Sequence, residues 1–184
     1  MFFDLDGTLC DTDEANYEAY AKAFNDEGYT ISESDFWEYA RGTHADFFIA
    51  KLAPNISTEA IARLRKRKAE YYPQLMHLIR PHKELISFLR VIAPLHETVL
   101  VTTASRQNAI HVLAASNISS LFKYKVFGDD VTNPKPHAEA YEKALQLTGL
   151  SSDEVIAFED SQAGIDAATA ASIKVIKVAI SHEI

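Results

Sequence analysis

The run Thr98-Val99-Leu100-Val101-Thr102-Thr103 decides the fold of this chain. It is rich in β-branched residues, its centre is wholly apolar, and Pro94 and Ser105 lie on either side of it. A short apolar run of this composition is typical of a strand that is buried on both faces of a parallel sheet. We therefore predict a buried parallel strand whose carboxyl end is at Thr103.

Helical and strand-like segments alternate on both sides of this run. An amphipathic segment that carries Leu85, Phe88, Leu89 and Ile92 precedes it. Strands that alternate with helices form right-handed βαβ units around a parallel sheet. We expect further strands ending at Phe2-Phe3-Asp4 and over 124–127, 155–158 and 174–178, and helices over 105–115, after Pro136 and from Ser161.

Residues 12–80 differ from the rest of the chain because their pattern is helical almost throughout. Small apolar residues fall on one face of a first helix, which Gly28 is well placed to end. Ser57 can cap a later helix. We therefore predict a Rossmann-like, doubly wound α/β core domain made of residues 1–11 and 81–184, with residues 12–80 inserted as an α-helical cap domain.

The composition excludes several classes of protein. Hydrophobic residues make up 47% and charged residues 24% of the chain, as in ordinary globular domains. The net charge of −8 argues against nucleic acid, whose phosphate backbone needs a basic surface. The single Cys10 cannot form an internal disulfide, and no segment resembles a signal or could span a bilayer. We expect a soluble cytoplasmic protein with no nucleic-acid or membrane partner, and a monomer by default.

Polar side chains stand where the predicted strands end. They are Asp4 and Asp6 after the first strand, Thr103, Lys135 in a loop before a helix, and Glu159-Asp160. In a parallel α/β sheet, ligands bind beyond the carboxyl ends of the strands. We therefore expect at least three carboxylates, one ammonium and one hydroxyl along one edge of the sheet.

This set of groups suits phosphoryl transfer. Crowded carboxylates repel one another, so a hard cation such as Mg²⁺ is needed to keep them ionised. An aspartate beside that ion can attack a phosphorus whose charge the ion and Lys135 partly neutralise. A second carboxyl two residues further on can protonate the leaving oxygen and then deprotonate the water that completes the reaction.

Each of these residues also has a purely structural interpretation. Asp4 and Asp6 could be turn residues, Lys135 a solvated lysine, and Thr103 a hydroxyl that bonds to the backbone. Glu159-Asp160 could favour the start of a helix. Their occurrence together, in this order and at strand ends, favours the functional interpretation.

Four motifs stand in order along the chain: Asp4-Leu5-Asp6-Gly7-Thr8-Leu9, the strand that ends at Thr103, Lys135-Pro136, and Glu159-Asp160-Ser161-Gln162-Ala163-Gly164. Together they resemble the haloacid dehalogenase superfamily of phosphohydrolases. The most similar branch has a helical cap inserted after the first motif and contains β-phosphoglucomutase and many small-metabolite phosphatases. The resemblance covers nearly the whole chain.

The resemblance implies a role for each matched carboxylate. Asp4 would be the nucleophile and a Mg²⁺ ligand. Asp6 would be the general acid and base, and its backbone carbonyl would also bind the metal. Asp160 would be the second carboxylate ligand, with Glu159 beside it.

The resemblance also implies contacts to the phosphate and the rest of the substrate. The phosphate would be bound by Thr103, the N–H of Ala104 and Lys135. Thr102 is an alternative to Thr103, because aligning a Thr-Thr pair leaves one residue of slack. In the cap, Arg41 lies in a loop that resembles one entering the active site, and Lys68 matches a lysine that contacts the substrate in the mutase branch.

Two positions bear on the reaction type. Members that displace halide do not need the second aspartate, so Asp6 favours phosphoryl transfer. Where the mutase branch has a histidine, this chain has Asn16, which titrates no proton. We therefore predict a Mg²⁺-dependent phosphohydrolase that cleaves a small phosphorylated metabolite through an aspartyl-phosphate on Asp4. The alternatives are a mutase of the β-phosphoglucomutase type and a non-catalytic relative that binds a phosphometabolite.

Overall fold

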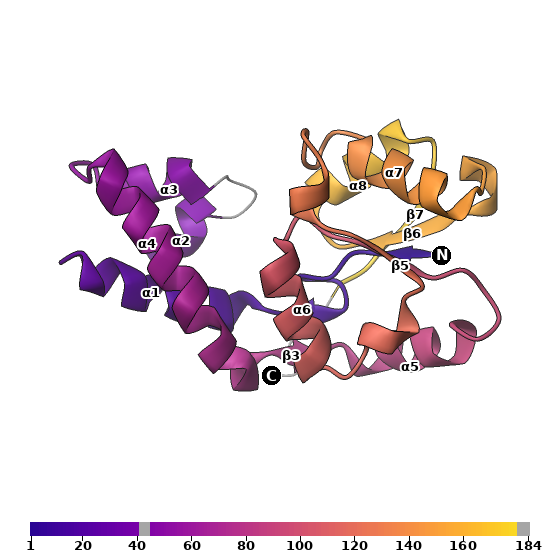
Figure 1. Ribbon diagram of the computed structural model, residues 1–184, viewed down its shortest axis with the longest axis horizontal. Coiled ribbons are helices and arrows are strands. Elements are labelled where there is room, and N and C mark those ends of the chain that lie inside the picture. The colour runs from indigo at the N-terminus through magenta and orange to yellow at the C-terminus, as the bar shows by residue number, and fades with distance from the viewer. Residues whose placement is uncertain (41–44, 180–184) are drawn as a thin grey trace. The chain divides into compact units, whose positions relative to one another are not determined.

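The computed structural model describes residues 1–40 and 45–179 of the chain (Figure 1). The chain forms two compact units. The first, here called the α/β unit, combines Met1–Thr12 with Ile79–Ile184, and the second, the helical unit, is Asp13–Leu78. The helical unit is therefore an insertion into the chain of the α/β unit.

A five-stranded parallel sheet forms the centre of the α/β unit. The strand order is β5-β4-β1-β6-β7, with bounds Phe2–Phe3 (β1), Val99–Val101 (β4), Tyr124–Val126 (β5), Ile156–Glu159 (β6) and Lys174–Lys177 (β7). In β1, Phe3 pairs with Leu100 of β4 on one side and with Phe158 of β6 on the other. The predicted parallel α/β sheet is confirmed, and β4 lies within the apolar run at 98–103. The strand ends at Val101 and not at the predicted Thr103, because Thr102 and Thr103 already belong to the loop that follows it.

Helices cover both faces of this sheet. They are α5 (Lys83–Ile92), α6 (Arg106–Ala115), α7 (Glu139–Thr148) and α8 (Gln162–Ala170), with short 3₁₀ helices at Ser119–Leu121 (η2), Gly128–Asp130 (η3) and Ser152–Glu154 (η4). Figure 1 shows α7 and α8 on one face and α5 and α6 on the other. This arrangement is the doubly wound fold that the sequence predicted.

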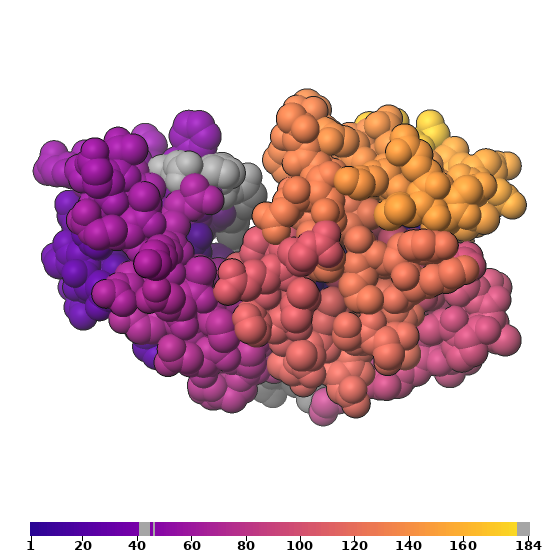
Figure 2. All heavy atoms as spheres, in the orientation of Figure 1, coloured from indigo at the N-terminus to yellow at the C-terminus, as the bar shows by residue number. Residues whose placement is uncertain are grey.

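Aromatic rings hold the short central strand in place. Phe2 and Phe3 are fully buried, and on the face shown in Figure 2 later segments of the α/β unit cover β1. Phe2 stacks on Tyr141 of α7 with ring centres 6.5 Å apart, and Phe3 stacks on Phe158 at 4.6 Å. Burial of such a ring contributes roughly 1.5–3 kcal/mol. The two rings therefore fix the position of Asp4, which follows directly.

A second, two-stranded sheet was not predicted. Its strands β2 (Cys10–Asp11) and β3 (Arg80–Pro81) pair antiparallel, with Cys10 opposite Pro81. The sequence pattern had been interpreted as helical from Asp11 onward, without a strand. Two-residue strands show no alternation of side chains, so periodicity could not reveal them.

The helical unit consists of α1 (Asp13–Asp26), α2 (Glu33–Ala40), α3 (Ala45–Leu52), α4 (Thr58–Tyr71) and the 3₁₀ helix η1 (Tyr72–Leu78). Its core contains Phe24, Phe36, Phe48, Ile49 and Leu64. Gly28 follows α1 with φ at +81°, a conformation that favours glycine. The predicted helical insertion is confirmed. Among the helices of residues 1–40 and 45–179, none is long and apolar enough to cross a membrane.

Candidate active site

The sheet brings three carboxylates together at its carboxyl edge. Asp4 directly follows β1, Glu159 ends β6, and Asp160 follows it. Since β1 and β6 are hydrogen-bonded neighbours, the first two side chains meet across one strand spacing. Oxygens of Asp4, Glu159 and Asp160 lie within 4.8 Å of one another. The sequence predicted this group of acids from the strand ends alone.

Lys135 enters the same cluster from the loop before α7. Its Nζ donates to Asp4 Oδ1 (2.7 Å), Glu159 Oε1 (2.5 Å) and the carbonyl of Val101 (2.8 Å). The side chain is only 3% exposed. Burial alone would lower the pKa of Lys135, but the carboxylates of Asp4 and Glu159 outweigh it and raise the pKa. The ammonium therefore stays charged and uses its three N–H groups on these acceptors.

Glu159 is the most enclosed of the acids. It is fully buried, and its Oε1 accepts hydrogen bonds from Lys135 and from the hydroxyl of Tyr141. Its Oε2 is buried and has no hydrogen-bond partner within residues 1–40 and 45–179. Burial and the nearby Asp4 charge raise the pKa of Glu159, and burial followed by Asp4 also raises that of Asp160. Both carboxyl groups are therefore harder to ionise than in water unless a further positive charge is bound beside them.

The charge of the cluster fits a divalent cation. Three carboxyl groups gather around a single ammonium, so full ionisation of all three needs a further positive charge. Carboxylate oxygens are the ligands that Mg²⁺ prefers, and the unpartnered Oε2 of Glu159 adds an oxygen in need of a positive charge. The side chains of Asp4, Glu159 and Asp160 therefore suit such an ion. The Asp6 carboxylate, predicted to bind metal only through its backbone, is not part of the cluster.

Asp6 is held by two buried threonines. Its Oδ1 accepts from Thr12 Oγ1 at 2.7 Å, and its Oδ2 lies 3.5 Å from Thr102 Oγ1. Thr12 had no predicted role, and Thr102 had been only an alternative phosphate contact. These hydroxyls fix the direction of the Asp6 carboxylate.

Gly7 allows the first loop to approach Asp160 closely. Its φ is +86°, and a Cβ at this position would lie 2.2 Å from Asp160 Oδ2. Next to it, the fully buried Thr8 donates to Asp160 Oδ1 at 3.0 Å. The glycine and the threonine of the first motif therefore position a carboxylate that lies more than 150 residues later in the chain.

The two threonines at the end of β4 occupy different environments. Thr102 is buried beside Asp6, whereas Thr103 is exposed. The N–H of Ala104 donates to Thr102 Oγ1 at 3.0 Å. Below them, a Cβ at Gly128 would lie 2.2 Å from the carbonyl oxygen of Thr103, so this close contact requires glycine.

Arg41 and Lys68 are the two predicted substrate contacts in the cap. Arg41 lies outside the described residues. Lys68 is 7% exposed and donates to Asn16 Oδ1 at 2.9 Å, with its Nζ 3.9 Å from the centre of the Tyr72 ring and 5.2 Å from that of Tyr20. Lys68 therefore differs from the neighbouring basic residues at 63 and 65–67, which are exposed.

The parallel sheet with acids and a lysine at its carboxyl edge defines an α/β enzyme whose site lies at the strand ends. The chain belongs to the haloacid dehalogenase-like hydrolases, since the model of this family matches residues 1–178, and it is a phosphatase of that family. This confirms the resemblance found in the motifs.

Several relatives cover nearly the whole chain. Protein CbbY of Rhodobacter capsulatus is 32% identical over 190 residues, which span 96% of this chain and 83% of that protein. The phosphorylated carbohydrates phosphatase of Thermotoga maritima is 26% identical over 179 residues, covering 95% and 82%. Among solved structures, CbbY of Rhodobacter sphaeroides in complex with phosphate has the same fold, with a TM-score of 0.86 at 24% identity and coverage of 100% and 88%.

Proposed function

We propose that the protein is a Mg²⁺-dependent phosphohydrolase that cleaves a small phosphorylated metabolite through an aspartyl-phosphate on Asp4. The observation that carries this proposal is the buried Lys135 ammonium, which bridges Asp4 and Glu159 inside a cluster of three carboxyl groups. An aspartate fixed by an ammonium is oriented for attack, and the same positive charge can stabilise a phosphate.

Asp4 acts as the nucleophile. Lys135 holds its Oδ1, so Oδ2 attacks the phosphorus, and the bond between phosphorus and the ester oxygen breaks. Asp6 gives a proton to the leaving oxygen. It then takes a proton from water, which attacks the phosphorus, releases inorganic phosphate and restores Asp4. The hydrogen bonds from Thr12 and Thr102 keep Asp6 in one orientation for both proton transfers.

The phosphate is bound by Lys135, the exposed Thr103 and the N–H of Ala104. In the structure Lys135 donates to three protein acceptors and the Ala104 N–H donates to Thr102 Oγ1, so a phosphate oxygen takes the place of one acceptor of each. Asp4, Asp160, Glu159 and the carbonyl of Asp6 would hold a Mg²⁺ ion, which would supply positive charge beside the phosphate oxygens.

The substrate is a phosphorylated sugar or a similar small phosphometabolite. This choice is supported by the relatives, which include a phosphorylated carbohydrates phosphatase and a 2-deoxyglucose-6-phosphate phosphatase. We assign substrate selection to the helical insertion, predicted as the cap over 12–80, with Arg41 and Lys68 as contacts. Hydrolysis is favoured over a mutase reaction, in which the phosphate moves to another hydroxyl of the sugar. Asn16, which accepts a hydrogen bond from Lys68, offers no titratable group for such a transfer.

Phosphate release from p-nitrophenyl phosphate and from a panel of sugar phosphates, with and without Mg²⁺, tests this function. We expect Mg²⁺-dependent release that falls by about 10⁴-fold or more in Asp4→Asn. Equal, metal-independent rates for the wild type and this variant would contradict the proposal. Interconversion of hexose phosphate isomers without net phosphate release would instead show a mutase.

A further inference from the structure

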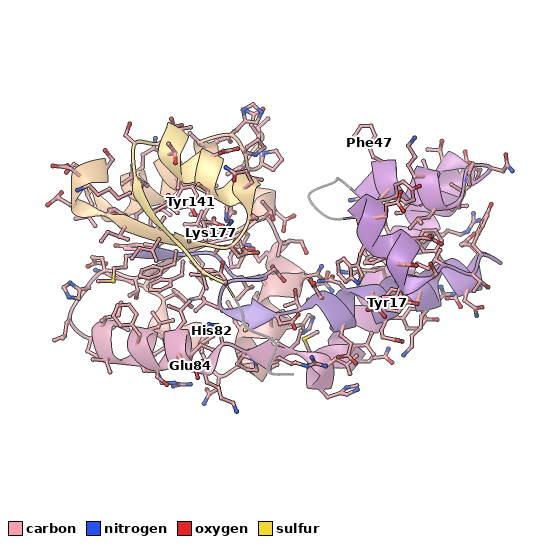
Figure 3. All side chains as sticks on the ribbon, turned by 180° about the vertical axis from the view of Figure 1, so that it is seen from behind. Tyr17, Phe47, His82, Glu84, Tyr141 and Lys177 are labelled. Carbon is pink, nitrogen blue, oxygen red and sulfur yellow. The ribbon has the colours of Figure 1, made fainter. Side chains whose placement is uncertain are left out.

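Tyr141 of α7 is a buried polar group at the site to which the sequence motifs assign no role. Figure 3 labels Tyr141 among the side chains of the α/β unit. The residue is fully buried, its ring stacks on Phe2, and its hydroxyl donates a hydrogen bond to Glu159 Oε1. The hydroxyl of Tyr141 is therefore a buried donor to this carboxylate.

The hydroxyl is not needed for packing. A phenylalanine would supply the same ring against Phe2, and a buried hydroxyl costs free energy unless it is hydrogen-bonded. Hydrogen bonds to a charged acceptor are stronger than those between neutral groups. The value of the hydroxyl at Tyr141 therefore lies in its bond to Glu159.

Glu159 is confined from two sides. On one side, its Oε1 receives both the Tyr141 hydroxyl and Lys135 Nζ. On the other side, its Oε2 lies against Gly164, where a Cβ would be only 1.9 Å away. Gly164 therefore leaves room for Oε2, and Tyr141 and Lys135 hold Oε1.

The position of Glu159 in turn sets that of Lys135. The ammonium divides its donors between Asp4 Oδ1, Glu159 Oε1 and the Val101 carbonyl, and it lies 5.3 Å from the centre of the Tyr141 ring. If Glu159 lost the hydroxyl, Lys135 would be the donor that remains on Oε1. The ammonium would then be drawn toward Glu159 and away from Asp4.

We propose that Tyr141 is a positioning residue whose hydroxyl, by fixing the Glu159 carboxylate, holds the Lys135 ammonium at Asp4 in the place where it meets the phosphate. This inference rests on the proposed function, in which Lys135 binds the phosphate. It predicts that loss of one hydroxyl, at a residue that touches neither substrate nor metal, weakens phosphate binding.

The test compares Tyr141→Phe with the wild type in the full chain. The readouts are kcat and KM for p-nitrophenyl phosphate with Mg²⁺, the inhibition constant of inorganic phosphate, and the thermal midpoint. We expect KM and the inhibition constant to rise about tenfold, which is the change in affinity expected for the loss of one hydrogen bond to a charged group. The thermal midpoint should move by only a few degrees. Tyr124→Phe is the matched control, since Tyr124 packs against the same core but its hydroxyl is not at the site, and it should leave all values unchanged.

Two results would overturn the inference. One is an inhibition constant in Tyr141→Phe within twofold of the wild type. The other is an equal change in Tyr124→Phe, which would trace the loss to general destabilisation. Asp4→Asn separates this inference from the proposed function. If that variant releases phosphate like the wild type, the proposed function fails; if it is inactive while Tyr141→Phe behaves as wild type, only the role of Tyr141 fails.

Discussion

Each unit of this protein buries a lysine, and the two lysines are held differently. In the α/β unit, Lys135 donates to the carboxylates of Asp4 and Glu159. In the helical unit, Lys68 donates to the amide oxygen of Asn16 and lies over the ring of Tyr72. Lys135 compensates the charges of two buried carboxylates. The amide of Asn16 and the ring of Tyr72, which Lys68 contacts, carry no charge. Removing Lys135 should therefore leave buried charges uncompensated and have the larger effect.

Lys135→Ala should have the largest effect. It leaves Asp4 and Glu159 buried without their cation, so we expect the free energy of unfolding of the α/β unit to fall by about 3–5 kcal/mol. Phosphate release should fall by about 10²- to 10³-fold, since the charge that stabilises the phosphate is gone. Chemical denaturation followed by circular dichroism and a phosphate-release assay measure the two effects.

The matched control for Lys135→Ala is Lys123→Ala. Lys123 also forms an ion pair, with Glu97 at 2.6 Å, but its side chain is 59% exposed, so its removal should leave stability and activity nearly unchanged. Similar losses in the two variants would contradict the view that burial gives the Lys135 pair its importance.

Gly164→Ala tests the confinement of Glu159 from the side opposite Tyr141. The new Cβ would lie 1.9 Å from Glu159 Oε2, so the carboxylate or α8 must move. We expect a stability loss of roughly 1–3 kcal/mol, as for other overpacked cores, together with weaker phosphate binding. The control is Gly149→Ala, where φ is +69° but nothing lies near the new Cβ, so stability falls and phosphate affinity does not. Unchanged phosphate affinity in Gly164→Ala would argue that Glu159 can shift without moving Lys135.

Lys68→Met should have a smaller effect than Lys135→Ala. It keeps the apolar stem but loses the hydrogen bond to Asn16 and the contact with Tyr72, so we expect a loss of about 1–2 kcal/mol. Trp37 of α2 is the single tryptophan, and its fluorescence during denaturation reports on the helical unit. Lys66 lies on α4 like Lys68, but at an exposed position, so Lys66→Met should leave this transition unchanged. A loss as large as that of Lys135→Ala would remove the contrast between the two lysines.

Mg²⁺ should stabilise only the α/β unit. Because an ion that binds the folded state adds RT ln(1 + [L]/Kd), Mg²⁺ at ten times its Kd should contribute about 1.4 kcal/mol. Thermal unfolding with Mg²⁺ and with chelator measures this contribution without any substrate. In Asp160→Asn the stabilisation should be much weaker, since one carboxylate ligand is lost. Equal stabilisation of this variant and the wild type would place the ion elsewhere.

The difference between the two units also explains what the sequence could predict. The apolar run that became β4 and the polar residues after Phe3 and Phe158 were sufficient to predict a parallel sheet with acids at one edge, because strand ends in such a sheet meet at one place. Lys135 was found through its motif. These predictions depend on chain topology, which leaves a clear pattern in the sequence.

The partners of those residues could not be predicted in the same way. Tyr141 and Thr12 reach the site through side-chain geometry, which has no period and no motif. The motif matched Thr103 to the phosphate, but which hydroxyl faces Asp6 depends on the path of the chain after β4, and there it is Thr102 that lies beside Asp6. Within the helical insertion, helices and caps were predictable from apolar spacing, Gly28 and Ser57. Substrate contacts were not, because they depend on the ligand.

The small sheet of β2 and β3 has a consequence for how such a chain can diversify. Cys10 and Asp11 pair with Pro81 and Arg80, so the point where the chain leaves the α/β unit is joined to the point where it returns. An insertion whose two ends are paired in this way can be lengthened, shortened or exchanged without moving the strands that carry Asp4 and Glu159. Substrate specificity can therefore change through mutations in the part of the gene that encodes the insertion, while the part that encodes the catalytic residues stays the same.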